Sequence, residues 1–98
     1  MAQFSVTAAE LRNKAEQLRQ QNEQFKTLSN GLKEQEQGLS GMWEGDARNT
    51  FRSEFQKSAT YMDNFHNGIN QYIQALEQII RKYEEAEAKN VEIAKTSA

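Results

Sequence analysis

The sequence predicts an all-α protein: an antiparallel helix-turn-helix hairpin that dimerises into an elongated four-helix bundle. Three features of the chain support this prediction. The chain contains no proline and is rich in the helix-forming residues Gln, Glu, Lys, Ala and Leu. Its apolar residues recur every seven positions in two long stretches. Between those stretches three of its five glycines gather, where a chain reversal is expected.

The composition limits both the size of the fold and the kinds of site it could hold. Ninety-eight residues are enough for one small domain, spanning 1–98, with a limited capacity to bury its own apolar surface. The absence of cysteine excludes a disulfide framework and a thiolate metal site, and no cofactor is expected. The net charge is −2 with acids and bases interspersed, so nucleic acid is not an expected partner.

A first helix is predicted over residues 8 to about 40. It begins with a capping box, in which Thr7 and Glu10 can each satisfy an exposed backbone N–H of the other. Val6 and Leu11 flank this start at the positions of a hydrophobic staple. The helix carries a strong apolar column, which is Phe4, Leu11, Leu18, Phe25, Leu32 and Leu39. Its companion column is weak and consists of Ala8, Ala15, Asn22 and Ser29, with Leu28 in the middle.

The reversal is predicted at residues 41–45, around Trp43. The clustered glycines that mark a helix C-cap and a turn are Gly38, Gly41 and Gly45. Gly45 is expected to supply a backbone conformation that other residues avoid. Asp46 then acts as the N-cap of the next helix or as an acid in its first turn.

Two glycines inside the first helix have two possible explanations. Gly31 and Gly38 lie seven residues apart and so share one helix face. They could allow a bulky residue such as Phe55 to approach closely. Alternatively, they are tolerated surface glycines, each at a cost of about 1 kcal/mol relative to alanine.

A second helix is predicted from about residue 46 to about residue 90, with a frayed tail to residue 98. Its heptad pattern has two strong columns over about five heptads, which is typical of antiparallel packing of the coiled-coil type. One column is Phe51, Ser58, Phe65, Tyr72, Ile79 and Ala86, and the other is Phe55, Met62, Ile69, Leu76 and Tyr83. Ile73 and Ile80 lie beside these columns and make the C-terminal half too broadly apolar for a single partner helix.

This surplus apolar surface predicts that the hairpin dimerises. A lone hairpin would expose an apolar patch of the kind that usually marks an interface. Two hairpins paired about a two-fold axis would cover that patch in a four-helix bundle. The residues expected to form the core and the dimer interface are Leu11, Leu18, Phe25, Leu32, Leu39, Phe51, Phe55, Met62, Phe65, Ile69, Ile73, Leu76 and Ile80.

The central motif and one further motif resemble a known family. Trp43-Glu44-Gly45 between two long helices, in a chain of about one hundred residues, resembles the WXG (ESAT-six-like) family of type VII secretion substrates and effectors. The family's second mark is a C-terminal Tyr-x-x-x-Asp/Glu export signal. Here Tyr83 and Glu87 match it, at i and i+4 on one helical face. The resemblance covers nearly the whole chain.

Membership in that family would imply export without a cleavable signal peptide, by a membrane-embedded ATPase-driven machine of a Gram-positive bacterium. The protein would be cytoplasmic before export, and secreted or held at the cell surface afterwards. Relatives leave as folded dimers, either homodimers or pairs with a family paralogue. The homodimer is favoured here because this chain carries both motifs itself. The expected partners are therefore a second copy or a paralogue, and the secretion ATPase.

The hairpin geometry predicts a relation between the two motifs. With the turn centred near residue 43, facing residues should have numbers that add to about 86. Tyr83 should then lie level with the start of the first helix. In an antiparallel dimer, Trp43 of one protomer would lie near Tyr83 and Glu87 of the other and form one composite surface at each pole.

Each motif also has a simpler, structural interpretation. Trp43 could plug the end of the bundle, and Tyr83 could be a packing residue. Glu87, taken without the family, is an exposed helix acid within a short acidic run. His66 is the only histidine and cannot form a transition-metal site by itself. No activated nucleophile and no fixed carboxylate pair is evident, so the chain is not expected to be an enzyme.

Two other functions remain open. The first is a membrane-active virulence toxin, although the polar faces lack the Lys/Arg bias of membrane-binding helices and no stable insertion is expected. The second is an intracellular coiled-coil adaptor in which both motifs are coincidental. Within the export interpretation, the protein is either an effector or a carrier and targeting partner for co-exported proteins.

Overall fold

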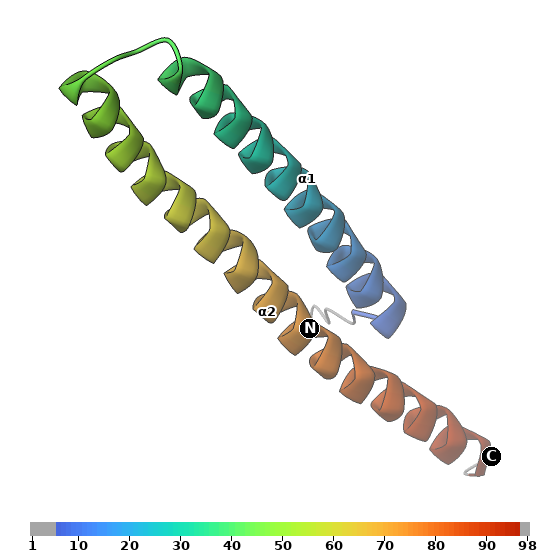
Figure 1. Ribbon diagram of the computed structural model, residues 1–98. Coiled ribbons are helices and arrows are strands. Elements are labelled where there is room, and N and C mark those ends of the chain that lie inside the picture. The colour runs from blue at the N-terminus through green and yellow to red at the C-terminus, as the bar shows by residue number, and fades with distance from the viewer. Residues whose placement is uncertain (1–5, 97–98) are drawn as a thin grey trace, which may run out of the picture.

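Two long antiparallel helices make up the protein in the computed structural model, which describes residues 6–96 (Figure 1). Helix α1 spans Ala8–Ser40 and helix α2 spans Asp46–Thr96. The hairpin is a thin rod, with principal-axis extents of 80 × 25 × 16 Å. This confirms the predicted all-α hairpin. Phe4, placed at the head of the strong column, lies outside the described residues.

The start of α1 is fixed by its N-cap. Thr7 has the extended backbone of a cap residue, and its Oγ1 accepts the backbone N–H of Glu10 at 3.1 Å. This is one of the two hydrogen bonds of the predicted capping box. At the other end, Met42 and Trp43 donate to carbonyls three residues back, at 3.0 and 3.4 Å, which tightens the chain after Ser40.

Gly45 makes the reversal possible. Its φ is +77°, the only positive value among the described residues, in the left-handed region that costs an L-residue about 1–2 kcal/mol. Its carbonyl accepts the N–H of Asn49 at 3.3 Å, the first hydrogen bond of α2. Asp46 is then the first helical residue, and its carboxylate lies in the first turn, where the helix dipole favours an acid.

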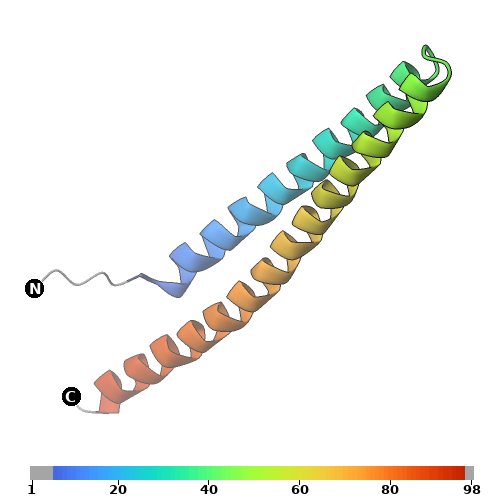
Figure 2. The same ribbon diagram turned by 90° about the vertical axis from the view of Figure 1, so that its left-hand side faces the viewer.

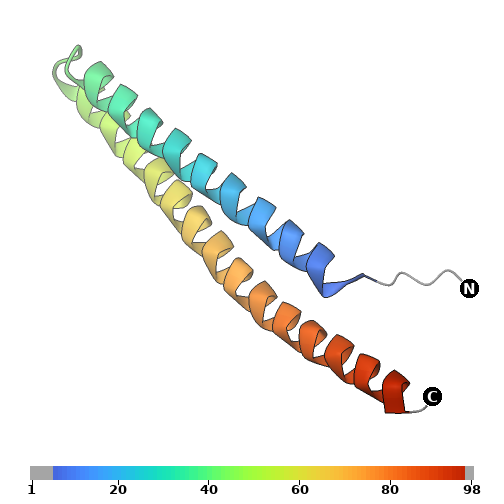
Figure 3. The same cartoon turned by 90° about the vertical axis from the view of Figure 1, so that its right-hand side faces the viewer.

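Helix α2 continues farther than the sequence pattern predicts. It ends at Thr96 rather than near residue 90, so the tail expected to fray is helical as far as the structure describes it. The segment after Lys89 contains no Gly or Pro that would end a helix. Figures 2 and 3 show the C-terminal turns of α2 extending past the start of α1.

The two helices meet along a seam that differs from the expected one. The α1 residues buried in it are Ala8, Ala15, Asn22 and Ser29 of the weak column, and Glu36 one heptad later. Leu28, placed with that column, is 70% exposed and lies outside the seam. On α2 the buried residues are His66, Ile73 and Ile80. Ile73 and Ile80 are only 3% and 0% exposed. They therefore pack within the hairpin and do not form the uncovered flank that the heptad pattern suggested.

The strong apolar columns lie outside the seam and form what we call the open face. Its exposed members include Leu32, Phe65, Tyr72, Ile79 and Tyr83. Partly covered members are Leu11, Leu18, Phe25, Phe51, Phe55, Met62, Ile69 and Leu76. Leu39 lies at the turn end of this face and is 36% exposed. The rings of Phe25 and Phe65, one from each helix, have centroids 5.1 Å apart, so the open face is continuous across the hairpin.

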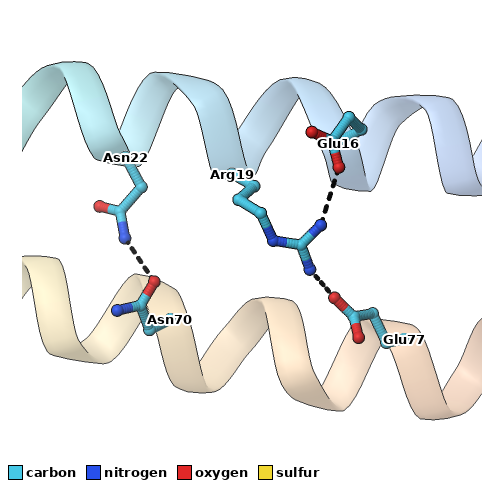
Figure 4. A network of polar contacts seen from close by, with 5 residues as sticks. All are labelled: Glu16, Arg19, Asn22, Asn70 and Glu77. Carbon is cyan, nitrogen blue, oxygen red and sulfur yellow. Dashed lines mark hydrogen bonds and ion pairs between the residues drawn. The ribbon is translucent and has the colours of Figure 1, made fainter.

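The opposite edge of the seam carries a charge ladder. Its ion pairs join Arg12 to Glu84, Arg19 to Glu77 and Lys33 to Asp63. Figure 4 shows Arg19 between Glu77 of α2 and Glu16 of its own helix. Together with Lys26, which has no acid opposite it, the basic members of this ladder recur every seven residues beside the small column of α1. The hairpin therefore has a charged edge and an apolar face on opposite sides of the seam.

Gly31 and Gly38 do not accommodate a close approach. A Cβ atom added at either position would meet nothing within 4 Å. The suggested contact with Phe55 is therefore wrong for this hairpin, and the interpretation as tolerated surface glycines holds. Over the described residues, neither helix has a stretch long and apolar enough to cross a membrane.

Candidate functional site

The turn presents Trp43 as a partly exposed aromatic. Its ring packs against Phe51 of the first turns of α2, with centroids 4.9 Å apart and planes inclined by 58°. Trp43 is 38% exposed and its neighbour Met42 is 79% exposed. The tryptophan therefore covers the end of the open face through Phe51 and still offers part of its ring to another molecule.

Tyr83 lies on the open face near the other end of the hairpin. It is 45% exposed and continues the column of Met62, Ile69 and Leu76 along α2. About 48 Å of helix separate it from Phe51, at 1.5 Å per residue. Figure 1 shows the turn and the C-terminal part of α2 far apart along the rod, so a single chain does not bring Trp43 and Tyr83 together.

Glu87 is bound to the start of α1. Its Oε1 accepts the backbone N–H of Ala8 at 2.8 Å. One helical turn earlier on α2, Glu84 pairs with Arg12 at 2.8 Å. Tyr83 and Glu87 are thus divided between two surroundings, with the phenol on the open face and the carboxylate against the first turn of the other helix.

The register between the helices differs from the expected one. Facing residues have numbers that add to between 88, for Asn22 with His66, and 96, for Arg19 with Glu77, rather than to about 86. The turn residues after Ser40 do not divide equally between the two helices, which raises this sum. Long side chains reach along the seam, which widens its range. The contacts of Glu84 and Glu87 with α1 nevertheless place Tyr83 beside the start of that helix, as predicted.

His66 is a residue of the seam. It is buried, and its Nε2 lies 3.8 Å from Oε1 of Glu23. A small polar cavity beside it is lined by Lys26, Ser29, Lys33 and Asp63 together with Asn30, Met62 and Asn67. Within residues 6–96 no three His, Cys, Asp or Glu side chains come together as a metal site would require.

Comparison with known families identifies the chain. The family described as "WXG100: Proteins of 100 residues with WXG" matches residues 3–88. The protein belongs to the WXG100 family. Proteins of this family are non-enzymatic and are typically type VII secretion substrates, and they commonly form dimers. No curated protein and no solved structure is significantly similar to the chain.

In this WXG100 protein the sequence indicated the two motifs but not the contact between the second motif and α1. The hydrogen bond from Ala8 to Glu87 joins residues 79 positions apart, so no local sequence pattern predicts it. The charge ladder could have been found. Arg12, Arg19 and Lys33 share a heptad position, and Asp63, Glu77 and Glu84 share another, which is the signature of two helix edges that face each other.

Proposed function

We propose that this WXG100 protein is exported by a type VII system as a folded homodimer in which two hairpins cover each other's open faces. The observation that supports the proposal is the exposure of the open face in the single chain. Phe65 and Ile79 are 56% and 52% exposed. Large apolar side chains left uncovered in a continuous band mark a protein interface.

The positions of the two motifs, at opposite ends of the open face, favour an antiparallel arrangement. Trp43, through Phe51, borders one end of this face, and Tyr83 borders the other. An antiparallel pair would therefore bring Trp43 of one protomer to Tyr83 of its partner at each pole of the bundle. Each pole would then bring together the turn motif, Trp43 and Gly45, and the export signal, Tyr83 and Glu87. Trp43 and Tyr83 supply the exposed rings of this composite surface, and the secretion ATPase is its proposed reader.

The homodimer is the simpler assembly because one chain carries both motifs. Pairing with a paralogue would use the same open face, but each pole would then carry only one of this chain's two motifs. Sedimentation of the purified protein alone distinguishes the two. A stable monomer at micromolar concentration would contradict the homodimer and would favour the paralogue.

Substitution on the open face tests whether dimerisation is needed for export. Phe65→Glu places a charge in the proposed interface while keeping a good helix former. Tyr61→Glu is the matched control, because Tyr61 is 75% exposed but lies outside both apolar columns. We expect Phe65→Glu to yield monomers that stay inside the cell, and Tyr61→Glu to yield exported dimers. Export of monomeric Phe65→Glu protein would contradict the composite surface.

The signal itself is tested by Tyr83→Ala, with secretion measured in the culture supernatant. Loss of export from an otherwise dimeric protein supports the assignment. Continued export would remove Tyr83 from the signal. Absence of the unaltered protein from the supernatant would favour the intracellular adaptor over the export substrate. A carrier role is tested by whether deleting the gene retains other proteins inside the cell.

A further inference from the structure

Glu87 belongs to the proposed export signal, yet its carboxylate already has a partner within the chain. Ala8 is the first residue of α1, and its N–H donates to Oε1 of Glu87 at 2.8 Å. The N–H groups of a first helical turn have no partner in their own helix. The positive end of the helix dipole adds an attraction for a carboxylate. Glu87 therefore caps α1 from the other helix.

A second contact fixes the same end of the hairpin. Arg12 Nη2 lies 2.8 Å from Oε1 of Glu84, one helical turn before Glu87. Glu84 and Glu87, one helical turn apart on α2, thus bind the first two turns of α1. Tyr83, adjacent to Glu84, is held in place by this pair of contacts while its ring stays on the open face.

We propose that Glu87 is a positioning residue of the export signal. It acts by fixing the segment around Tyr83 to the start of α1, and not by contacting the secretion machine. This inference rests on the proposed export function. It means that the signal is complete only in a folded hairpin, since the N–H donor and the carboxylate lie 79 residues apart in the chain.

The decisive variant removes the donor and leaves the signal residues untouched. Ala8→Pro does this at the first helical position, where proline is well tolerated. The preceding residue, Thr7, has φ −82° and ψ 155°, the extended conformation that a following proline requires. Ala8→Val is the matched control, because it adds as many carbon atoms as proline does and keeps the N–H.

Four variants at positions 8 and 87, one double variant and a charge control separate positioning from direct contact. Glu87→Ala removes the acceptor, whereas Glu87→Gln keeps an acceptor oxygen and removes the charge. Positioning predicts that Ala8→Pro and Glu87→Ala each lower the secreted fraction about tenfold, and that combining them lowers it no further, because both remove the same interaction. Glu87→Gln and Ala8→Val should stay within about threefold of the unaltered protein, since each retains the hydrogen bond. Glu85→Ala, in the same acidic run, controls for lost charge.

Normal export of Ala8→Pro, together with loss of export in both Glu87 variants, would overturn the proposal and place the carboxylate in contact with the machine. If Ala8→Pro lowers the melting temperature of the dimer, the comparison of Glu87→Gln with Glu87→Ala decides instead. Amide exchange provides a readout that does not depend on export. The Ala8 N–H should exchange about threefold or more faster in Glu87→Ala than in Glu87→Gln. Failure of the export function itself is distinct, because the unaltered protein would then be absent from the culture supernatant.

Discussion

The side chain of Asn22 donates from its Nδ2 to Oδ1 of Asn70 at 2.9 Å, across the middle of the seam (Figure 4). The same nitrogen lies 3.1 Å from the carbonyl oxygen of His66. A buried amide that satisfies groups on the facing helix favours one register, because any slip leaves those groups without a partner. The seam holds Asn22 among small side chains, so this pair aligns α1 with α2.

Asn22→Ala should therefore weaken the hairpin. We expect the free energy of unfolding to fall by about 1–2 kcal/mol, the cost of leaving buried acceptors without a donor. Urea denaturation at fixed protein concentration measures the change. Gln20→Ala, on the exposed face of α1, is the control and should be nearly neutral. Equal stability of the two variants would show that the Asn22–Asn70 pair does not hold the register.

Asn70→Asp should complete the charge ladder. Lys26 shares the heptad position of Arg19 and Lys33, and Asn70 shares that of Asp63 and Glu77, so this is the one position of the ladder that lacks an acid. The new carboxylate keeps Oδ1 as the acceptor for Asn22. We expect a gain of about 0.3–0.5 kcal/mol at low ionic strength and almost none in 1 M salt, about where the Debye length falls to 3 Å.

The control for that prediction is Asn64→Asp, on the exposed side of α2 away from the ladder. It adds the same charge without facing the basic column. A gain that persists in 1 M salt, or one that Asn64→Asp reproduces, would contradict pairing with Lys26.

Ile79 and Ile80 provide a matched pair of neighbours with opposite roles. Ile80 is 0% exposed in the seam, so Ile80→Ala should destabilise the hairpin by about 2–4 kcal/mol through lost burial and a residual cavity. Ile79 is exposed on the open face, so Ile79→Ala should change monomer stability by less than about 1 kcal/mol. Its effect should appear instead in the dimer dissociation constant. Denaturation and sedimentation over a concentration series separate the two effects, and a reversed order would refute the assignment of the faces.

Replacement of glycine by alanine should stabilise the protein at three positions and destabilise it at one. Gly31→Ala, Gly38→Ala and Gly68→Ala should each raise the free energy of unfolding by about 0.5–1 kcal/mol, because each site is helical and open to an added methyl group. Gly45→Ala should lower it by about 1–2 kcal/mol, because its φ of +77° is unfavourable for alanine. Thermal melting measures both effects. Destabilisation by Gly31→Ala would indicate a close neighbour at that face in the assembled protein.

Much of the fold follows from local sequence signals. Thr7 marks the start of α1, and the glycine cluster marks the turn, because caps and left-handed positions restrict the residue type directly. Local signals do not show which apolar column packs within the hairpin and which stays on the open face. A heptad pattern shows that Phe65 and Ile73 both face apolar surroundings, but it does not say which of them faces the same chain.

Side-chain size decides that question here. Ala8, Ala15 and Ser29 allow α1 to approach α2 closely, and the isoleucines at positions 73 and 80 fill the narrow space between the helices. The larger residues of the open face would fit the wider core of the proposed four-helix bundle. The small residues of the weak column and the charged positions beside it could therefore have identified the seam from the sequence. The contact of Glu87 with Ala8 needed the register as well, which no single segment encodes.

The slenderness of the hairpin has a consequence for transport. A helix with its side chains is about 10–12 Å across, so a four-helix bundle is roughly 20–24 Å across in each transverse direction, whatever its length. Pairing two antiparallel hairpins, with Trp43 beside the partner's Tyr83, thickens the 80 Å rod and lengthens it by about 20 Å, the length of helix after Tyr83 at 1.5 Å per residue. A channel that admits the folded dimer end-on needs to be only as wide as the bundle, whatever the length of the bundle. Passage without unfolding therefore depends on how the dimer is oriented at the mouth of the channel.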